Sequence, residues 1–219
     1  MHLILVALYG PDGVGKSSQI DIISDNLVKD GCKVKKIWIR APHTLAFLIA
    51  TVLVKFGFSV DDVNSFGRVK KLPNVGSNFI VKNIWAFIEF ISVLPLILFK
   101  VVIPVKLGST IVADRYLLDT IVSIAYYIKD IDFVDGTIAR ILMWFIPRNS
   151  VLIHLDADYD TLLARRGRLV ESREFIDFQK EAYSRLSKRV SSNYIDTSSL
   201  SIDETSSAIN KVIKDYFGT

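Results

Sequence analysis

The fold of this chain follows from the stretch Gly10-Pro-Asp-Gly-Val-Gly-Lys-Ser17. It matches the pattern G-x-x-x-x-G-K-[ST], which is typical of a phosphate-binding loop. The apolar run Leu3–Leu8 precedes it and the amphipathic segment Ser17–Asp30 follows it. A strand, a glycine-rich turn and a helix in this order predict a P-loop. The residues expected to bind the cofactor are Gly10, Pro11, Asp12, Gly13, Val14, Gly15, Lys16, Ser17 and Ser18.

The residue types in this loop suit the phosphates of ATP. The glycines at positions 10, 13 and 15 allow the backbone to wrap closely, so that successive N–H groups point at phosphate oxygens. A helix that begins near Lys16 adds the positive end of its dipole. We expect Lys16 to reach the β- and γ-phosphates and the Ser17 hydroxyl to ligate Mg²⁺. The loop therefore predicts ATP and Mg²⁺ as cofactors.

Short apolar runs alternate with longer segments of helical periodicity along the 219 residues. This alternation predicts a parallel sheet covered by helices on both faces. We expect one α/β domain over residues 1–219, with the three-layer P-loop NTPase fold and a five-stranded parallel sheet flanked by helices. The predicted strands are Leu3–Leu8, Val34–Ile39, Thr110–Ala113, Val151–Leu155 and Tyr194–Asp196. The predicted helices are Ser17–Asp30, Phe79–Leu107, Leu117–Phe145, Tyr159–Arg166, Arg173–Val190 and Ile202–Phe217, with a loop over Phe56–Asn78.

The composition narrows the classes of function. The net charge of +4 is modest and the basic residues are scattered, so we expect small anionic ligands and no nucleic acid. The single cysteine, Cys32, favours a reducing compartment, and we expect the protein to be cytoplasmic. The histidines His2, His43 and His154 lack the spacing of metal ligands, which argues against zinc chemistry.

The apolar segment Phe79–Val105 has two interpretations. It contains Lys82, Glu89 and Lys100 and is interrupted by two prolines, and its longest uncharged stretch, Phe90–Phe99, is about half of what spans a bilayer. We therefore expect a buried helix or helix pair and no transmembrane helix. Peripheral contact with a membrane is the alternative, because so much apolar surface is unusual for a soluble protein.

Several motifs together resemble the thymidylate kinase family of nucleoside monophosphate kinases. The loop carries an acidic residue, Asp12, within its turn, and Trp38-Ile-Arg-Ala-Pro42 resembles the family's Arg-x-Pro element. Ile111-Val-Ala-Asp-Arg-Tyr116 resembles its Asp-Arg-Tyr signature. Leu162-Leu-Ala-Arg-Arg-Gly-Arg168 and Glu171-Ser-Arg173 resemble its lid, which we place at about residues 165–175.

The resemblance implies a role for each matching residue. Catalytic cations would be Lys16, Arg115, Arg165, Arg166 and Arg168, and the metal would be held at Ser17 and Asp114. Substrate-binding residues would be Asp12, Arg40, Phe87, Phe90 and Arg115, with one phenylalanine stacking on the acceptor base. Structural roles remain open for several of them: Asp12 could cap a turn, Arg40 could be a surface arginine, Asp114 and Arg115 could form an ion pair, and some lid arginines could lie on a solvated helix face.

The sequence departs from the family on the acceptor side. The family has an arginine about one helical turn after its stacking phenylalanine, whereas Glu89 is the only charge in that region here. Three functions therefore remain: conversion of dTMP to dTDP with ATP, the same reaction on another nucleotide or a non-nucleotide acceptor, or nucleotide binding by a regulator without turnover. Relatives often dimerise, and a homodimer packed through the apolar helices would explain the segment Phe79–Val105.

Overall fold

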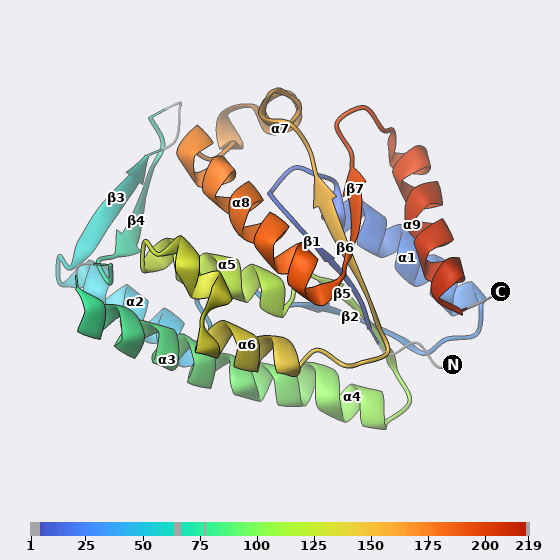
Figure 1. The fold of residues 1–219 in the computed structure, drawn as a ribbon, viewed down its shortest axis with the longest axis horizontal. Coiled ribbons are helices and arrows are strands. Elements are labelled where there is room, and N and C mark those ends of the chain that lie inside the picture. Colours follow the sequence, from blue (N-terminus) through green and yellow to red (C-terminus); the bar gives the residue numbers. More distant parts are fainter. Residues whose placement is uncertain (1–4, 64–66, 77, 218–219) are drawn as a thin grey trace.

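The computed structural model describes residues 5–63, 67–76 and 78–217 (Figure 1). At its centre lies a sheet of five parallel strands in the order β2-β5-β1-β6-β7. This confirms the predicted fold class, and each predicted strand is present, although residues 3 and 4 lie outside the described residues. The strands are β1 (Leu5–Tyr9), β2 (Val34–Trp38), β5 (Thr110–Asp114), β6 (Ser150–Asp156) and β7 (Asn193–Asp196).

The side chains of β1 divide the core between the two faces of the sheet. Leu5, Ala7 and Tyr9 pack into one cluster, while Val6 and Leu8 pack into the other. Alternate residues of a strand point to opposite faces, and a strand buried on both faces is therefore apolar throughout. On one face lie α1 (Lys16–Lys29) and α9 (Ile202–Phe217). On the other lie α2 (Thr44–Lys55), α3 (Phe79–Ile97), α5 (Leu117–Tyr127), α6 (Thr137–Trp144) and much of α8 (Arg173–Val190).

The strand register places the ends of three strands side by side. Leu8 and Trp38 both align with Asp114, so the segments that follow β1, β2 and β5 leave the sheet at one edge. In open parallel sheets this carboxyl edge is where ligands bind. The P-loop after Tyr9, Arg40 after β2 and Arg115 after β5 therefore share one location.

The apolar segment after residue 78 is a long helical element with an irregular middle. Helix α3 continues through a π-helical turn, Leu98–Val102, into α4 (Ile103–Lys106). The π-helical turn lies between Pro95 and Pro104, each of which removes a backbone donor from the helical ladder. Phe79–Lys106 is long and apolar enough to cross a membrane by length and composition, with 33% of its most apolar window buried.

The prediction of a buried helix holds for only one face of α3. Trp85, Ala86 and Val93 are buried against the core, whereas the opposite face is open to solvent. The expectation was wrong for that outer face because the segment is apolar on all sides, and so its composition does not show which side packs. The exposed apolar residues of this element include Phe79, Ile80, Ile84, Phe87, Ile91, Leu98, Phe99, Ile103 and Leu107.

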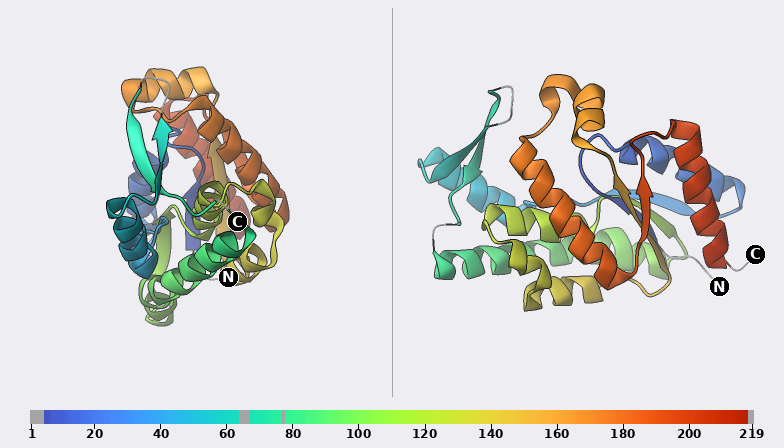
Figure 2. Two further views of the ribbon diagram at one scale, coloured as in Figure 1. Left: turned by 90° about the vertical axis from the view of Figure 1, so that its left-hand side faces the viewer. Right: turned by 45° about the horizontal axis from the view of Figure 1, so that its top comes forward.

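Three other segments differ from the sequence-based prediction. The expected loop Phe56–Asn78 contains an antiparallel hairpin of β3 (Ser59–Val63) and β4 (Val69–Pro73), which projects above α2 and beside α8 (Figure 2). Helix α2 was not predicted. The expected helix Leu117–Phe145 is interrupted after α5, where Lys129 adopts a left-handed conformation, and a 3₁₀ turn (Ile131–Asp135) follows before α6. The remaining helix, α7 (Tyr159–Arg166), agrees with the prediction.

Candidate active site

The P-loop connects β1 to α1 at the carboxyl edge of the sheet. Gly10 and Gly13 have positive φ angles of 136° and 101°, which only glycine adopts without strain. A Cβ on Gly10 would lie 1.9 Å from the carbonyl oxygen of Leu155, so any side chain there would clash with β6. The loop therefore fits against the sheet only with glycine at position 10, and α1 begins directly after it at Lys16.

Lys16 is buried beneath the loop. Its Nζ donates to the carbonyl oxygens of Gly10 and Pro11, at 2.8 and 2.6 Å. Burial lowers the pKa of this ammonium to about 8, while the nearby carboxylates of Asp119 and Asp114 oppose the shift. The loop thus holds a desolvated cation where the motif places the phosphates.

Ser17 and Asp114 meet at the end of β5. The Ser17 hydroxyl donates to Oδ2 of Asp114 at 2.6 Å. The other oxygen, Oδ1, is buried and has no hydrogen-bond partner in the part of the chain that the structure describes. A hydroxyl and an unsatisfied carboxylate oxygen are suitable ligands for Mg²⁺. The same described residues contain no group of three or more His, Cys, Asp or Glu side chains arranged around a metal.

Arg115 joins the P-loop to the interior of the domain. It follows β5 with a positive φ of 71°. The residue is 5% exposed, and its guanidinium forms an ion pair with Asp12. A second nitrogen donates to Asp119 at 3.0 Å, and the Tyr183 hydroxyl donates to the same carboxylate oxygen at 2.8 Å. The strained backbone and the two carboxylates hold this arginine in place at the edge of the P-loop.

Further cations surround the carboxylate of Asp12. Its Oδ2 lies 3.3 Å from Nη1 of Arg40 and 3.7 Å from Nη1 of Arg166, while Lys16 is 3.9 Å from Oδ1. Arg166 also pairs with Glu171. One carboxylate therefore faces four cations, and the cluster keeps an excess of positive charge that suits phosphate groups.

The lid arginines point to different places. Arg166 belongs to the cluster around Asp12, and Arg165 donates to the carbonyl oxygen of Thr197 at 2.6 Å and to its hydroxyl at 3.1 Å. Arg168 is exposed on a 3₁₀ turn, and Arg173, at the start of α8, lies 5.4 Å above the ring of Tyr159. The structure thus brings Arg165 and Arg166, but not Arg168, to the P-loop.

Most of the predicted site residues line a single cavity of about 400 Å³. Its lining brings Lys16, Ser17, Asp114 and Arg115 together with the lid arginines Arg165 and Arg166. A neighbouring cavity of about 420 Å³ extends past Arg165 to Thr197 and the start of α9. The lining of the first cavity is Asp12, Gly13, Gly15, Lys16, Ser17, Ser18, Trp38, Arg40, Asp114, Arg115, Arg165 and Arg166.

The two phenylalanines expected to stack on a base lie elsewhere. Phe87 is 57% exposed on the outer face of α3, with the ring of Phe90 at 6.5 Å. Neither lines the P-loop cavity. The neighbouring Glu89 points inward instead and is fully buried. Its Oε2 accepts from the backbone N–H of His43 at 3.2 Å and lies 3.1 Å from Nδ1 of the His43 ring. This turn of α3 therefore presents Phe87 outward and a paired carboxylate inward, while Phe90 packs against the core.

Sequence reasoning missed the contribution of Trp38 to the P-loop cavity. It also missed Arg68 and Lys70, two cations of the hairpin that approach Asp12 and Arg40 from the other side. The signal for Arg68 and Lys70 was the basic stretch Arg68-Val-Lys-Lys71, in which alternate residues of a strand share a face.

The sheet order and the P-loop define an α/β fold of the P-loop NTPase type, with a cavity lined by cations at the carboxyl edge of the sheet. Thymidylate kinase from Candida albicans has a similar structure, with a TM-score of 0.56, 16% sequence identity, and coverage of 97% of this chain and 92% of that chain. The fold is thus thymidylate kinase-like. No model of a protein family and no curated protein sequence matches this chain.

Proposed function

We propose that this protein is an ATP- and Mg²⁺-dependent nucleoside monophosphate kinase, with dTMP as the first acceptor to test. The observation that carries the proposal is the Ser17–Asp114 pair, which lines the same cavity as Lys16 and Arg115. A P-loop lysine, a hydroxyl and a carboxylate suited to Mg²⁺, and a buried arginine are the groups that phosphoryl transfer from ATP requires.

The reaction would be a direct in-line transfer to a phosphate oxygen of the acceptor. That oxygen is already anionic, so no general base is needed. Lys16 and Arg115 would neutralise charge on the phosphates, and Arg165 and Arg166, in the lid segment 165–175, would add positive charge and exclude water. Ser17 and Asp114 would hold Mg²⁺, which would supply positive charge that offsets the charge of the phosphates. The cavity between Arg165, Thr197 and Ile202 would take the nucleoside end of ATP.

The test is ADP release from ATP and Mg²⁺ over a panel of nucleoside monophosphates. Turnover is expected with at least one acceptor, and Lys16→Ala is expected to abolish it. Lys29→Ala, at the other end of the same helix, is the matched control and should retain activity. If wild-type protein releases no ADP with any monophosphate, the kinase proposal fails.

A second candidate is the same reaction on a different acceptor. It is favoured by the absence of Phe87 and Phe90 from the P-loop cavity, because the expected thymine-stacking ring is then missing. The Candida albicans enzyme is itself described as having broad substrate specificity. The panel therefore includes several bases, and a non-catalytic regulator is the remaining outcome if ATP binds without transfer to any acceptor.

We also propose a cytoplasmic homodimer joined through the exposed apolar faces of α2 and α3. Four apolar side chains are each more than 60% exposed: Leu48 in α2, Phe56 just after α2, and Phe79 and Ile80 in α3. Contiguous exposed apolar surface of this kind marks contact sites. Light scattering should give twice the monomer mass, whereas a monomeric mass would remove this proposal and leave peripheral membrane contact as the alternative.

A further inference from the structure

The P-loop cavity continues into a groove formed by the β3–β4 hairpin. A second cavity, of about 350 Å³, shares Asp12, Arg40 and Arg166 with the P-loop cavity. A third, of about 390 Å³, shares Asp62 and Ser172 with the second. We call the second and third cavities together the hairpin groove. Shared lining residues make it continuous with the P-loop, and its volume is in the range of small-molecule sites.

The near half of the hairpin groove is rich in cations. Arg68 and Lys70, from the hairpin, face Arg40 and Arg166, from the core and the lid. Asp12, Asp62 and Glu171 are the carboxylates in the same lining. The pKa of the Lys70 ammonium is lowered, first because surrounding atoms desolvate it and next because of the nearby Arg40 guanidinium. Arg68 and Lys70 are nevertheless accessible to solvent, and several accessible cations in one lining favour a phosphate group.

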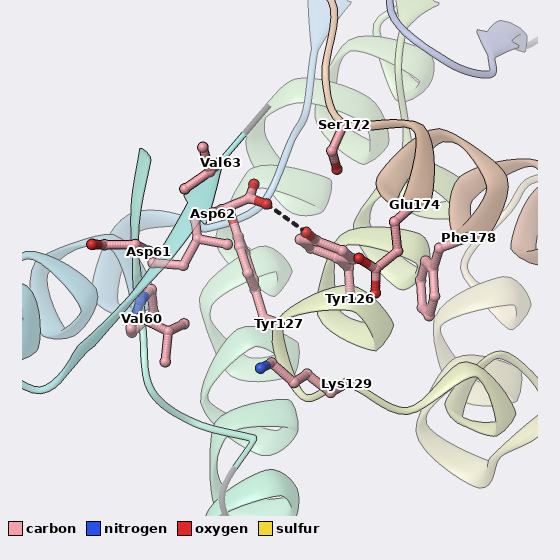
Figure 3. A pocket seen from close by; sticks show the side chains of 12 residues that line it. Val60, Asp61, Asp62, Val63, Tyr126, Tyr127, Lys129, Ser172, Glu174 and Phe178 are labelled. Carbon is pink, nitrogen blue, oxygen red and sulfur yellow. Dashed lines mark hydrogen bonds between the residues drawn. The ribbon is translucent and has the colours of Figure 1, made fainter. Parts of the chain in front are cut away.

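The far half of the hairpin groove carries aromatic rings beside the charged side chains of Asp61, Asp62, Lys129 and Glu174. Tyr126 and Tyr127 of α5 face Val60 and Val63 of the hairpin, and Phe178 of α8 closes the side (Figure 3). Flat rings of this kind are complementary to another flat ring, through stacked or edge-on contacts. A cationic half followed by an aromatic half matches a molecule with a phosphate at one end and an aromatic group at the other.

The ring of Tyr126 is fixed in place. Its hydroxyl donates to Oδ1 of Asp62 at 2.8 Å, which ties the hairpin to α5 (Figure 3). The rings of Phe175 and Phe178 make edge contacts with it, at centroid distances of 4.3 and 5.5 Å. A ring held on three sides loses little conformational freedom when a ligand packs against it, and such preorganisation favours binding.

We propose that the β3–β4 hairpin is one wall of the acceptor site and that the acceptor is a nucleoside monophosphate rather than a sugar phosphate or a lipid phosphate. Its phosphate binds between Lys70, Arg68 and Arg40, facing the P-loop. Its base packs against Tyr126 and Tyr127. Asp62 is a positioning residue, because it acts through the Tyr126 ring and the placement of the hairpin. This inference rests on the proposed function, in which the P-loop cavity holds the donor.

The test is calorimetric titration of the full chain, in the presence of Mg²⁺ and ADP, with dTMP, dCMP, dAMP and dGMP. Ribose 5-phosphate and farnesyl phosphate serve as probes without a base. At least one nucleotide should bind more tightly than both. Lys70→Ala should weaken its binding about tenfold or more, as expected for the loss of a hydrogen bond to a charged group. Lys71→Ala, on the opposite face of the same strand, is the matched control and should stay within about twofold of wild type.

The aromatic half has its own variants. Tyr126→Leu should weaken binding of the nucleotide but leave the affinity for ribose 5-phosphate unchanged. Asp62→Ala should have the same effect to a smaller extent. The proposal is overturned if no nucleotide binds, if ribose 5-phosphate or farnesyl phosphate binds as tightly as the best nucleotide, or if Lys70→Ala binds like wild type.

The kinase assay separates this inference from the proposed function. Binding that responds to Lys70 and Tyr126 as stated, without ADP release, would refute the kinase and leave the assignment of the hairpin groove standing. Turnover with an acceptor KM that is unchanged in Lys70→Ala would refute the groove and leave the kinase standing.

Discussion

The hydroxyl oxygen of Ser17 lies 2.6 Å from Oδ2 of Asp114, although 97 positions separate the two residues in the chain. The pair forms because the P-loop follows β1, Asp114 ends β5, and these strands are neighbours in the sheet. The proposed site for Mg²⁺ is therefore a consequence of the strand order. Its oxygens are oriented before any nucleotide binds, as expected for an electrostatically preorganised site.

Asp114→Asn should reduce the effect of Mg²⁺ on nucleotide binding. The substitution keeps the shape of the side chain but removes the charge that would hold the cation, and changes of this kind typically cost about 10–100-fold in metal affinity. Calorimetry of ADP binding with and without Mg²⁺ measures this effect of the cation on ADP affinity. Metal-free ADP should bind within about threefold of wild type. Asp25→Asn, on the same α1 helix as Ser17, is the control, and an unchanged effect of Mg²⁺ in Asp114→Asn would contradict the assignment.

The lid arginines should differ in importance. Arg165→Ala and Arg166→Ala should each lower kcat by about 10²–10³, the usual cost of removing one group that stabilises charge in the transition state. Arg168→Ala should cost less, because Arg168 is exposed on its turn and does not line the P-loop cavity. Arg140→Ala, on the distant helix α6, is the control. Steady-state kinetics with saturating ATP would measure kcat for each variant. An equal loss of kcat in all three lid variants would contradict this order.

Lys16 should take up a proton when nucleotide binds at alkaline pH. Its pKa of about 8 means that a sizeable fraction is neutral at pH 8.5, whereas phosphates stabilise the charged form and raise the pKa in the complex. ADP affinity should therefore fall as pH rises from 8 to 10. Calorimetry in buffers of different ionisation enthalpy at pH 8.5 would show the uptake. Binding without any proton linkage would mean that Lys16 is fully charged before nucleotide binds.

His154 should make stability depend on mildly acidic pH. It is buried against the stacked ring of Tyr9, with Nδ1 at 3.0 Å from the Ser187 hydroxyl, and burial lowers its pKa to about 4. The unfolded chain, with a pKa near 6.5, binds more protons between these two values. Stability is thus lost as pH falls through this window, by about 2 kcal/mol between pH 6.5 and 5. Urea unfolding of wild type and His154→Phe measures the difference, and parallel curves would contradict it.

Glu89→Ala should destabilise the fold. The carboxylate is fully buried and serves the backbone and ring of His43, so its removal leaves buried donors without their acceptor. A buried donor left without its acceptor typically costs about 1–3 kcal/mol. Glu89→Gln, which keeps an oxygen acceptor, should cost clearly less. Urea unfolding measures both, and equal stability of Glu89→Ala and wild type would show that the pair contributes nothing.

The central sheet could be predicted because burial on both faces leaves a simple pattern. Val6, Leu8, Ile111 and Val112 belong to short apolar runs separated by helical segments, and that pattern is particular to parallel sheets. The positions of the P-loop, Asp114 and Arg115 could also be predicted, because each belongs to a short motif at the end of a recognisable apolar strand. The structure brings them into one cavity, as expected.

The acceptor side could not be predicted in the same way. The strands of the β3–β4 hairpin are charged and half exposed, so Asp61-Asp62 and Lys70-Lys71 resemble a loop in sequence. Whether Phe87 faces the core or the solvent depends on which side of α3 packs, and an all-apolar helix gives no such signal. Within the Asp12 cluster, Arg40 and Arg115 follow strands that end beside the P-loop, whereas the ion pair between Asp12 and Arg166 depends on how the helix of Arg166 packs in the tertiary structure.

The most direct test of the account is the fate of the γ-phosphoryl group of ATP. The protein would be incubated with Mg²⁺, ATP labelled with ¹⁸O in the γ-phosphate, and each nucleoside monophosphate, and the products would be analysed by mass spectrometry. The account predicts a nucleoside diphosphate whose terminal phosphate carries the label, formed by wild type and not by Lys16→Ala. Label found only in inorganic phosphate, or retained in ATP with every acceptor, would contradict it.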